Sequence, residues 1–166
     1  FRGVATVVLK LLEITAPRWA YFGRKDAQQV RLIGQMASDL ALDSEIVTCP
    51  IVREPDGLAM SSRNAYLSPE ERHGATVLYR ALDAVRLTAS AGERDAARLL
   101  ETARTVLAGE PLAKPEYVEL VDAEKFERIM QLRGACLLLL AVRIGATRLI
   151  DNLQLETEGP TVRCTL

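Results

Sequence analysis

Two short clusters hold the residue types best suited to chemistry, and each follows an apolar segment of the chain. The first cluster, residues 21–29, passes through Gly23 to Lys25 and Asp26. A glycine turn that leads into a helix presents backbone N–H groups and the positive helix end to an anion, and a lysine can reach a phosphate. The cluster therefore indicates phosphate binding. The alternative is a plain glycine turn with an exposed lysine and Asp26 as a helix N-cap.

The second cluster, residues 52–64, places two hydroxyl groups and a guanidinium in one loop. Its sequence is Val-Arg-Glu-Pro-Asp-Gly-Leu-Ala-Met-Ser-Ser-Arg-Asn, so Ser61, Ser62 and Arg63 are consecutive. Serine hydroxyls can donate to phosphate oxygens, and the arginine fork can bind two of them at once. A triphosphate-binding loop would have this composition, and so would a solvated surface loop rich in serine and arginine.

The elements that would position these clusters alternate between helix and strand. Apolar residues recur with helical spacing over residues 4–12, and a short strand is predicted over residues 19–22. A second helix follows over residues 26–40 and a second strand over residues 45–52. This order is typical of a parallel, doubly wound α/β sheet, in which the loop after each strand lies on the ligand side.

A helix start marks a predicted domain boundary near Leu67. Ser68 can cap the helix, Pro69 suits its first position, and Glu71 can complete a capping box. Two helices, to about residue 88 and to about residue 107, and three strands, over residues 117–122, 135–144 and 147–153, are predicted beyond it. The predicted domains are a parallel α/β part over residues 1–66, a small α+β domain over residues 67–156 and a polar tail over residues 157–166.

Composition excludes several classes of protein. The chain of 166 residues is 49% hydrophobic, which is enough to bury a core. Its 21 basic and 22 acidic residues leave a net charge of −1, so it lacks the basic field of a nucleic-acid-binding protein. The longest apolar run, residues 135–142, is far shorter than the roughly 20 residues that span a membrane, and it is predicted to be a buried strand.

The cysteines and the start of the chain carry two further expectations. Cys49, Cys136 and Cys164 are far apart, with His73 as the one histidine, so neither a disulfide framework nor a zinc site is predicted and a reducing cytoplasm fits best. No secretory signal opens the chain. Helical spacing begins only four residues into the chain, so the sequence is expected to begin partway through a fold.

Taken together and in this order, the clusters resemble the pantoate-beta-alanine ligases, or pantothenate synthetases. The resemblance is to the C-terminal part of that family and covers residues 1–156. Its motifs are Phe-Arg-Gly-Val at residues 1–4, the clusters at residues 21–29 and 52–64, and the segments at residues 66–72, 117–122 and 147–152. The implied fold is the second half of a Rossmann-like nucleotide-binding domain followed by a small α+β C-terminal domain.

The resemblance also implies an activity and a set of site residues. The family joins pantoate to beta-alanine through a pantoyl-adenylate, with Mg²⁺ carried on the triphosphate of ATP, and it is commonly dimeric. By resemblance Gln29 would bind pantoate, and Lys25, Ser61, Ser62 and Arg63 would be catalytic. The residues implied to bind ATP are Gly23, Lys25, Asp26, Val52, Met60, Ser61, Ser62 and Arg63.

The sequence departs from the family pattern in what it lacks and at two positions. It lacks the His-x-Gly-His nucleotide motif and the second pantoate-binding glutamine of the family's first half. Arg24 stands where the family usually has an acid or an amide, and Ile51 stands where threonine is common. We therefore expect the isolated chain to be inactive, and a noncatalytic remnant or interaction module of the same family is the alternative.

Overall fold

The computed structural model describes residues 1–159 and 161–166, which form two compact units. Unit one is Phe1–Ile51 and unit two is Val52–Leu166. The division falls earlier than the boundary predicted after residue 66, because the loop over residues 52–66, the 52–66 loop, packs with unit two. Leu58 of this loop is 2% exposed and belongs to the hydrophobic core of unit two.

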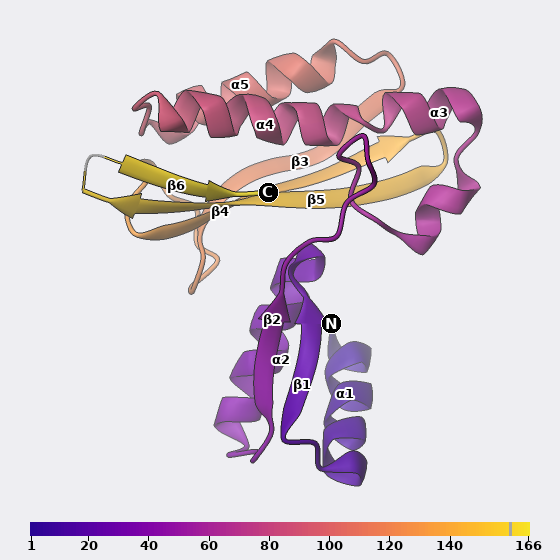
Figure 1. Cartoon of the computed structure of the whole chain (residues 1–166), viewed down its shortest axis with the longest axis vertical. Helices are drawn as coiled ribbons and strands as arrows, with labels where there is room; N and C mark the ends of the chain where they lie inside the picture. The colour runs from indigo at the N-terminus through magenta and orange to yellow at the C-terminus, as the bar shows by residue number, and fades with distance from the viewer. Residues whose placement is uncertain (160) are drawn as a thin grey trace. The chain divides into compact units, whose positions relative to one another are not determined.

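Unit one has the predicted order of helix, strand, helix and strand. Its elements are α1 (Arg2–Thr15), β1 (Trp19–Gly23), the 3-10 helix η1 (Arg24–Asp26), α2 (Ala27–Asp39) and β2 (Glu45–Cys49). The two strands pair in parallel, from Trp19 with Glu45 to Gly23 with Cys49, and α2 packs against α1 and both strands (Figure 1). Because α2 connects parallel neighbours, the chain turns from the carboxyl end of β1 directly into a helix.

Unit one leaves apolar side chains uncovered. Val7, Leu11 and Ile14 recur at intervals of three and four residues on α1 and are 58%, 54% and 76% exposed. Trp19 and Tyr21 lie on one face of β1 and are 46% and 65% exposed. Parallel sheets are normally covered on both faces, so these surfaces are suited to packing against further protein.

Unit two is an antiparallel sheet with helices along one face (Figure 1). Its elements are η2 (Ser62–Tyr66), α3 (Pro69–Gly74), α4 (Val77–Ser90), α5 (Ala96–Ala108), β3 (Ala113–Asp122), β4 (Ala135–Ile144), β5 (Thr147–Glu158) and β6 (Thr161–Thr165). The strands lie in chain order, β3-β4-β5-β6, so β4 and β5 are central. A parallel α/β part followed by an α+β part confirms the predicted fold class.

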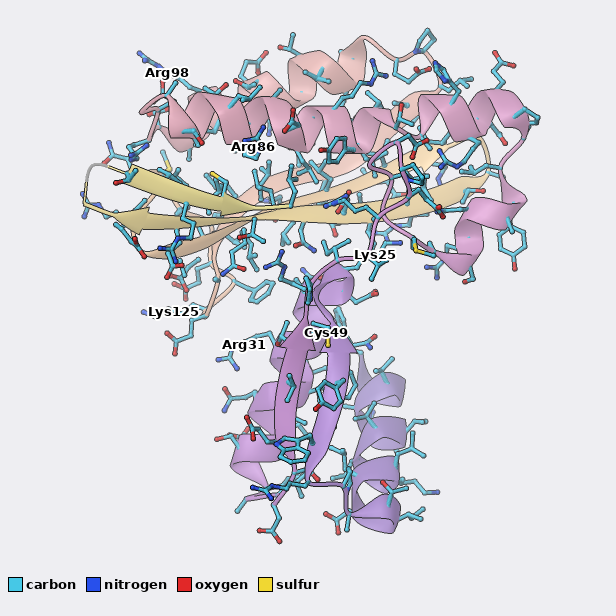
Figure 2. All side chains as sticks on the ribbon, viewed as in Figure 1. Lys25, Arg31, Cys49, Arg86, Arg98 and Lys125 are labelled. Carbon is cyan, nitrogen blue, oxygen red and sulfur yellow. The ribbon has the colours of Figure 1, made fainter. Side chains whose placement is uncertain are left out.

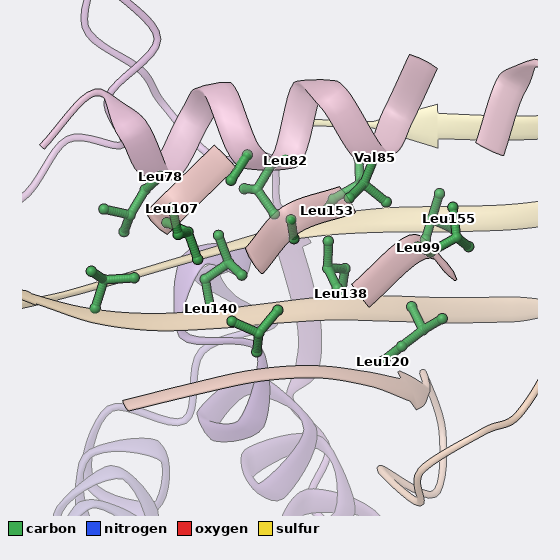
Figure 3. Close-up of a cluster of buried hydrophobic side chains, with 14 of the residues drawn as sticks. Leu78, Leu82, Val85, Leu99, Leu107, Leu120, Leu138, Leu140, Leu153 and Leu155 are labelled. Atoms are coloured by element: carbon green, nitrogen blue, oxygen red, sulfur yellow. The ribbon is translucent and has the colours of Figure 1, made fainter. Parts of the chain in front are cut away.

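The core of unit two lies between its helices and its sheet (Figure 3). Leu78, Leu82 and Val85 recur every three or four residues along α4, so they form one buried stripe. They pack in the same cluster as Leu138 of β4 and Leu153 of β5, which are fully buried. Each such side chain contributes about 1.5–3 kcal/mol by leaving water. The predicted buried strand over residues 135–142 is thus confirmed as most of β4.

The capping box after Leu67 is confirmed, but the helix that it starts is interrupted. The Glu71 N–H donates to Ser68 Oγ over 3.2 Å, and the Ser68 N–H donates to the Glu71 carboxylate over 2.9 Å. The helix predicted to run to about residue 88 instead breaks between α3 and α4. Thr76 lies at the break, where its hydroxyl donates to the His73 carbonyl and competes with regular helix bonding. His73 is exposed on α3, as predicted for a helix-surface residue.

Residues 157–166 were predicted to be a polar tail, but the structure extends the sheet into them. β5 continues to Glu158, and β6 pairs with it from Gln154 with Thr165 to Glu158 with Thr161. Val162 is buried between exposed neighbours, which is the alternation of an edge strand with one covered face. The segment is short and has few apolar residues, so its composition hides that alternation.

Candidate functional site

The first predicted cluster lies where β1 passes through η1 into α2. Gly23 ends β1, Lys25, labelled in Figure 2, lies in η1, and Asp26 occupies the N-cap position of α2. The Asp26 carboxylate is exposed and makes no capping hydrogen bond, so it does not play the part that the plain N-cap interpretation assigned to it. Its oxygens can accept hydrogen bonds from a ligand hydroxyl.

The fold of unit one does not itself require glycine at residue 23. Gly23 has an ordinary φ of −72°, and a Cβ atom added there would meet nothing within 4 Å. Glycine at such a position suits a ligand that approaches the backbone closely. Lys25 and Gln29 are half-buried, and in the sequence they flank the first residue of α2, Ala27.

The second predicted cluster forms a tight hairpin at the start of unit two. Arg53 and Ala59 form an antiparallel bridge, and the Met60 N–H donates to the Val52 carbonyl over 2.9 Å. The turn needs Gly57, because its φ is +89° and a Cβ atom there would lie 2.3 Å from the Tyr79 ring. The Val52 and Met60 side chains remain exposed, at 65% and 50%.

The three residues after the hairpin form an ordered, solvent-facing turn. Ser61 is the N-cap of η2, and its Oγ accepts from the Arg63 N–H over 3.3 Å. Ser62 and Arg63 are exposed, and no acidic side chain in the described part of the chain forms an ion pair with Arg63. An exposed guanidinium on a fixed turn can bind an anion bidentately. The two predicted clusters thus belong to different units, Gly23, Lys25, Asp26 and Gln29 to unit one and Val52 and residues 60–63 to unit two.

Sequence reasoning missed the residues that hold this loop. The Arg53 guanidinium donates to both carboxylate oxygens of Asp151 in β5, over 2.7 and 3.0 Å. The Arg72 guanidinium does the same for Asp56, over 2.7 and 3.1 Å. One signal was present, because Asp151 shares a face of a predicted strand with the apolar Leu149. A buried aspartate on such a face nearly always has a partner.

The Asp56–Arg72 pair predicts a titration. The hydrogen bonds from Arg72 lower the pKa of Asp56 below its usual value of 3.8. A lowered pKa means that the pair stabilises the fold above pH 3.8, and that this stability is lost as the pH falls through the lowered pKa. Arg72→Gln should raise the pKa of Asp56 in a carboxyl NMR titration. Asp122, whose pKa is lowered by the backbone N–H groups of Lys125 and Glu124, should be unchanged. An unmoved Asp56 would contradict the attribution.

Comparison with known proteins assigns the chain to a family. The family model for pantoate-beta-alanine ligase matches residues 1–154. The chain belongs to the pantoate-beta-alanine ligase family. It is 57% identical over 156 residues to the pantothenate synthetase of Roseiflexus castenholzii, which covers 94% of this chain and 56% of that relative. The chain therefore spans little more than half the length of a curated relative.

Solved structures of pantoate-beta-alanine ligases share the fold. The Thermus thermophilus pantothenate synthetase has a TM-score of 0.88 at 43% identity, over 92% of this chain and 55% of that one. The Francisella tularensis pantoate-beta-alanine ligase, complexed with beta-gamma ATP and beta-alanine, has a TM-score of 0.62 at 34% identity, over 90% of this chain and 48% of that one.

The described residues of our chain form no helix with the length and apolar character that a membrane span requires.

Proposed function

We propose that this chain is part of a cytoplasmic enzyme that condenses pantoate with beta-alanine in a reaction that consumes ATP. The observation that carries the proposal is the exposed guanidinium of Arg63 on the ordered turn after Ser61, in a chain of the pantoate-beta-alanine ligase family. The beta-gamma ATP and beta-alanine complexed with the Francisella tularensis relative support the choice of substrates. The full-length protein would act as a homodimer, so this chain would have a second copy of itself as its partner.

In the first proposed step, a pantoate carboxylate oxygen attacks the α-phosphorus of ATP. A bond forms from oxygen to phosphorus, the bond to the bridging oxygen of the β-phosphate breaks, and pyrophosphate leaves. Lys25 and Arg63 neutralise the charge that develops on pyrophosphate, and the hydroxyls of Ser61 and Ser62 donate to its oxygens. Asp26 accepts from the ribose, while the backbone at Gly23, Val52 and Met60 lines the nucleotide.

In the second proposed step, the uncharged amine of beta-alanine attacks the acyl carbon of pantoyl-adenylate. The carbon–nitrogen bond forms, the bond to the phosphate oxygen breaks, and AMP leaves while the nitrogen loses a proton. Mg²⁺ would accompany the triphosphate, since it commonly binds through phosphates and waters. Among the described residues, no group of three or more His, Cys, Asp or Glu side chains could hold a metal ion.

A hybrid enzyme tests the proposal. In it, this chain replaces the matching residues of the Roseiflexus castenholzii pantothenate synthetase, to which it is 57% identical. The hybrid should release pyrophosphate only when both pantoate and ATP are present, and should form pantothenate when beta-alanine is added. A folded hybrid with neither activity would instead favour the noncatalytic remnant or interaction module.

Gln29 should affect pantoate more than ATP. In the hybrid enzyme, Gln29→Leu leaves the polar groups of bound pantoate without a partner, which costs about 1–3 kcal/mol and should raise the pantoate KM roughly tenfold. The ATP KM should stay nearly unchanged in initial-rate measurements. Gln28→Leu, at an exposed neighbouring position on α2, is the matched control and should change neither KM. Equal increases in both KM values for Gln29→Leu would indicate a disturbed helix and contradict the assignment.

A further inference from the structure

We propose that Arg53 and Asp151 form a clamp that positions the 52–66 loop for adenylate formation without touching ATP. They would be positioning residues, and the proposal rests on the proposed function of Ser61, Ser62 and Arg63. Both residues lie in segments that carry the family resemblance, at residues 52–64 and 147–152, but the resemblance assigns a role to neither of them. The residues are 98 positions apart, and the contact joins the base of the loop to the central strand β5.

The clamp is nearly closed to solvent and uses both terminal nitrogens of the arginine. The side chains of Arg53 and Asp151 are 13% and 1% exposed. Besides its two bonds to the carboxylate, the Arg53 guanidinium donates from Nη1 to the Gly57 carbonyl over 2.9 Å. The Asn152 N–H also donates to Asp151 Oδ1, over 2.8 Å. A planar guanidinium that meets a carboxylate with two parallel bonds fixes direction as well as distance.

The clamp lies where it controls the direction of the hairpin. Arg53 is itself a bridge residue of the hairpin, and its bond to Gly57 ties the turn to the same guanidinium that binds β5. The guanidinium carbon also lies 5.3 Å from the centre of the Tyr79 ring on α4, within the range of a cation–π contact. The far strand of the hairpin leads directly into Met60 and Ser61. A rotation of the hairpin would therefore move the proposed catalytic turn.

The chemistry of the pair favours positioning over simple stabilisation. Apolar side chains of similar volume often replace a buried ion pair without loss of stability, because two charges must lose their water. The hairpin already has an apolar anchor in Leu58, whose side chain lies in the core of unit two. Apolar contacts are non-directional, so Leu58 anchors the hairpin to the hydrophobic core of unit two without fixing the direction of the hairpin. The bidentate clamp supplies that direction.

Amide hydrogen exchange on this chain tests the clamp directly. Asp151→Asn keeps the shape but removes the charge, and Arg53→Lys keeps the charge but removes the fork. In both variants the loop amides that donate within the hairpin, those of Glu54, Gly57 and Met60, should exchange about tenfold faster or more, while core amides of β4 keep their protection. If Asp151→Asn does not fold, the milder Arg53→Lys carries the test. Uniform loss of protection, or none, would overturn the clamp.

Catalysis in the hybrid enzyme gives the second readout. A displacement of about 1 Å can cost up to about 100-fold in rate, so both variants should lower kcat for pyrophosphate release about tenfold or more, with the pantoate KM nearly unchanged. Glu116→Gln is the matched control, because it weakens exposed pairs with Arg143 and Arg148 and should leave kcat unchanged. An unchanged kcat with a loosened loop would overturn the positioning role. An unsubstituted hybrid without activity would contradict the proposed function instead. The amide hydrogen exchange measurement would then still test the clamp, because it does not depend on catalysis.

Discussion

Replacing Lys25 or Arg63 by alanine in the hybrid enzyme is expected to lower adenylate formation by about 100-fold or more. Loss of one preorganised electrostatic group at a centre of developing charge typically has an effect of about 10²–10³ on kcat. Each side chain would supply a positive charge where pyrophosphate departs. The measurement is pyrophosphate release with saturating pantoate and ATP and without beta-alanine, so that only the first step is observed.

Matched substitutions separate this effect from a general loss of positive charge. Lys125→Ala and Arg133→Ala remove the same charges from exposed positions of unit two and should leave the rate of adenylate formation unchanged. Thermal unfolding of all four variants would show whether each is folded at the assay temperature. Less than about a threefold loss in both Lys25→Ala and Arg63→Ala would contradict their assigned roles.

The local features of the fold were predictable because their causes are local. Helical spacing identified α1 and α2, and the capping box at Ser68 has both hydrogen bonds that its residue types predicted. The run of apolar residues in β4 is buried as expected, because a continuous apolar segment of this length offers no polar side chains to turn toward solvent. In each case neighbouring residues alone determine the outcome.

The remaining features depend on contacts between distant residues. The 52–66 loop belongs to unit two because Leu58 enters its core and Arg53 meets Asp151, and no pattern around residue 53 reveals a partner 98 positions away. β6 is a strand because it pairs with the end of β5, which short-range composition does not report. Tertiary pairing of this kind overrides local preference, especially for short strands.

The candidate site likewise has features that residue types predict and features that depend on the folded structure. The residue types at Lys25, Ser61 and Arg63 are enough to indicate anion binding, because charge and hydroxyl groups define what a site can bind. Whether Asp26 caps α2 or leaves its carboxylate for a ligand depends on the geometry of the helix start, where the side chain makes no capping bond. The support of the loop by Arg53 and Asp151 depends on the whole sheet, because the sheet brings β5 to the base of the loop.

The largest expected effect concerns the chain tested by itself, for which we predict no turnover. Unit one has a sheet of only two parallel strands, and Val7, Leu11 and Ile14 on α1 remain more than half exposed. Parallel sheets normally have more strands and are covered on both faces. The chain also spans only 56% of the Roseiflexus castenholzii relative. We therefore expect the unmatched part of that relative to supply both the missing cover and the remaining substrate contacts.

Restoration of activity provides the test. The isolated chain should release no pyrophosphate above background and should self-associate through its exposed apolar surface. Adding the unmatched segment of the relative as a separate polypeptide, or joining it in the hybrid enzyme, should give pantothenate formation that depends on ATP, pantoate and beta-alanine. The hybrid that carries Lys25→Ala is the control, because its failure to turn over would show that the recovered activity uses residues of this chain.

Each outcome leads to a different conclusion about the chain. Turnover by the isolated chain would refute the prediction that its site is incomplete. A soluble, folded hybrid without activity would favour the noncatalytic remnant, and the next variant would then be Arg24→Gln, which restores an amide beside Lys25 where the family usually has an acid or an amide. Recovery on that change would assign the defect to one added positive charge in η1, because the substitution removes the charge beside the proposed phosphate contact.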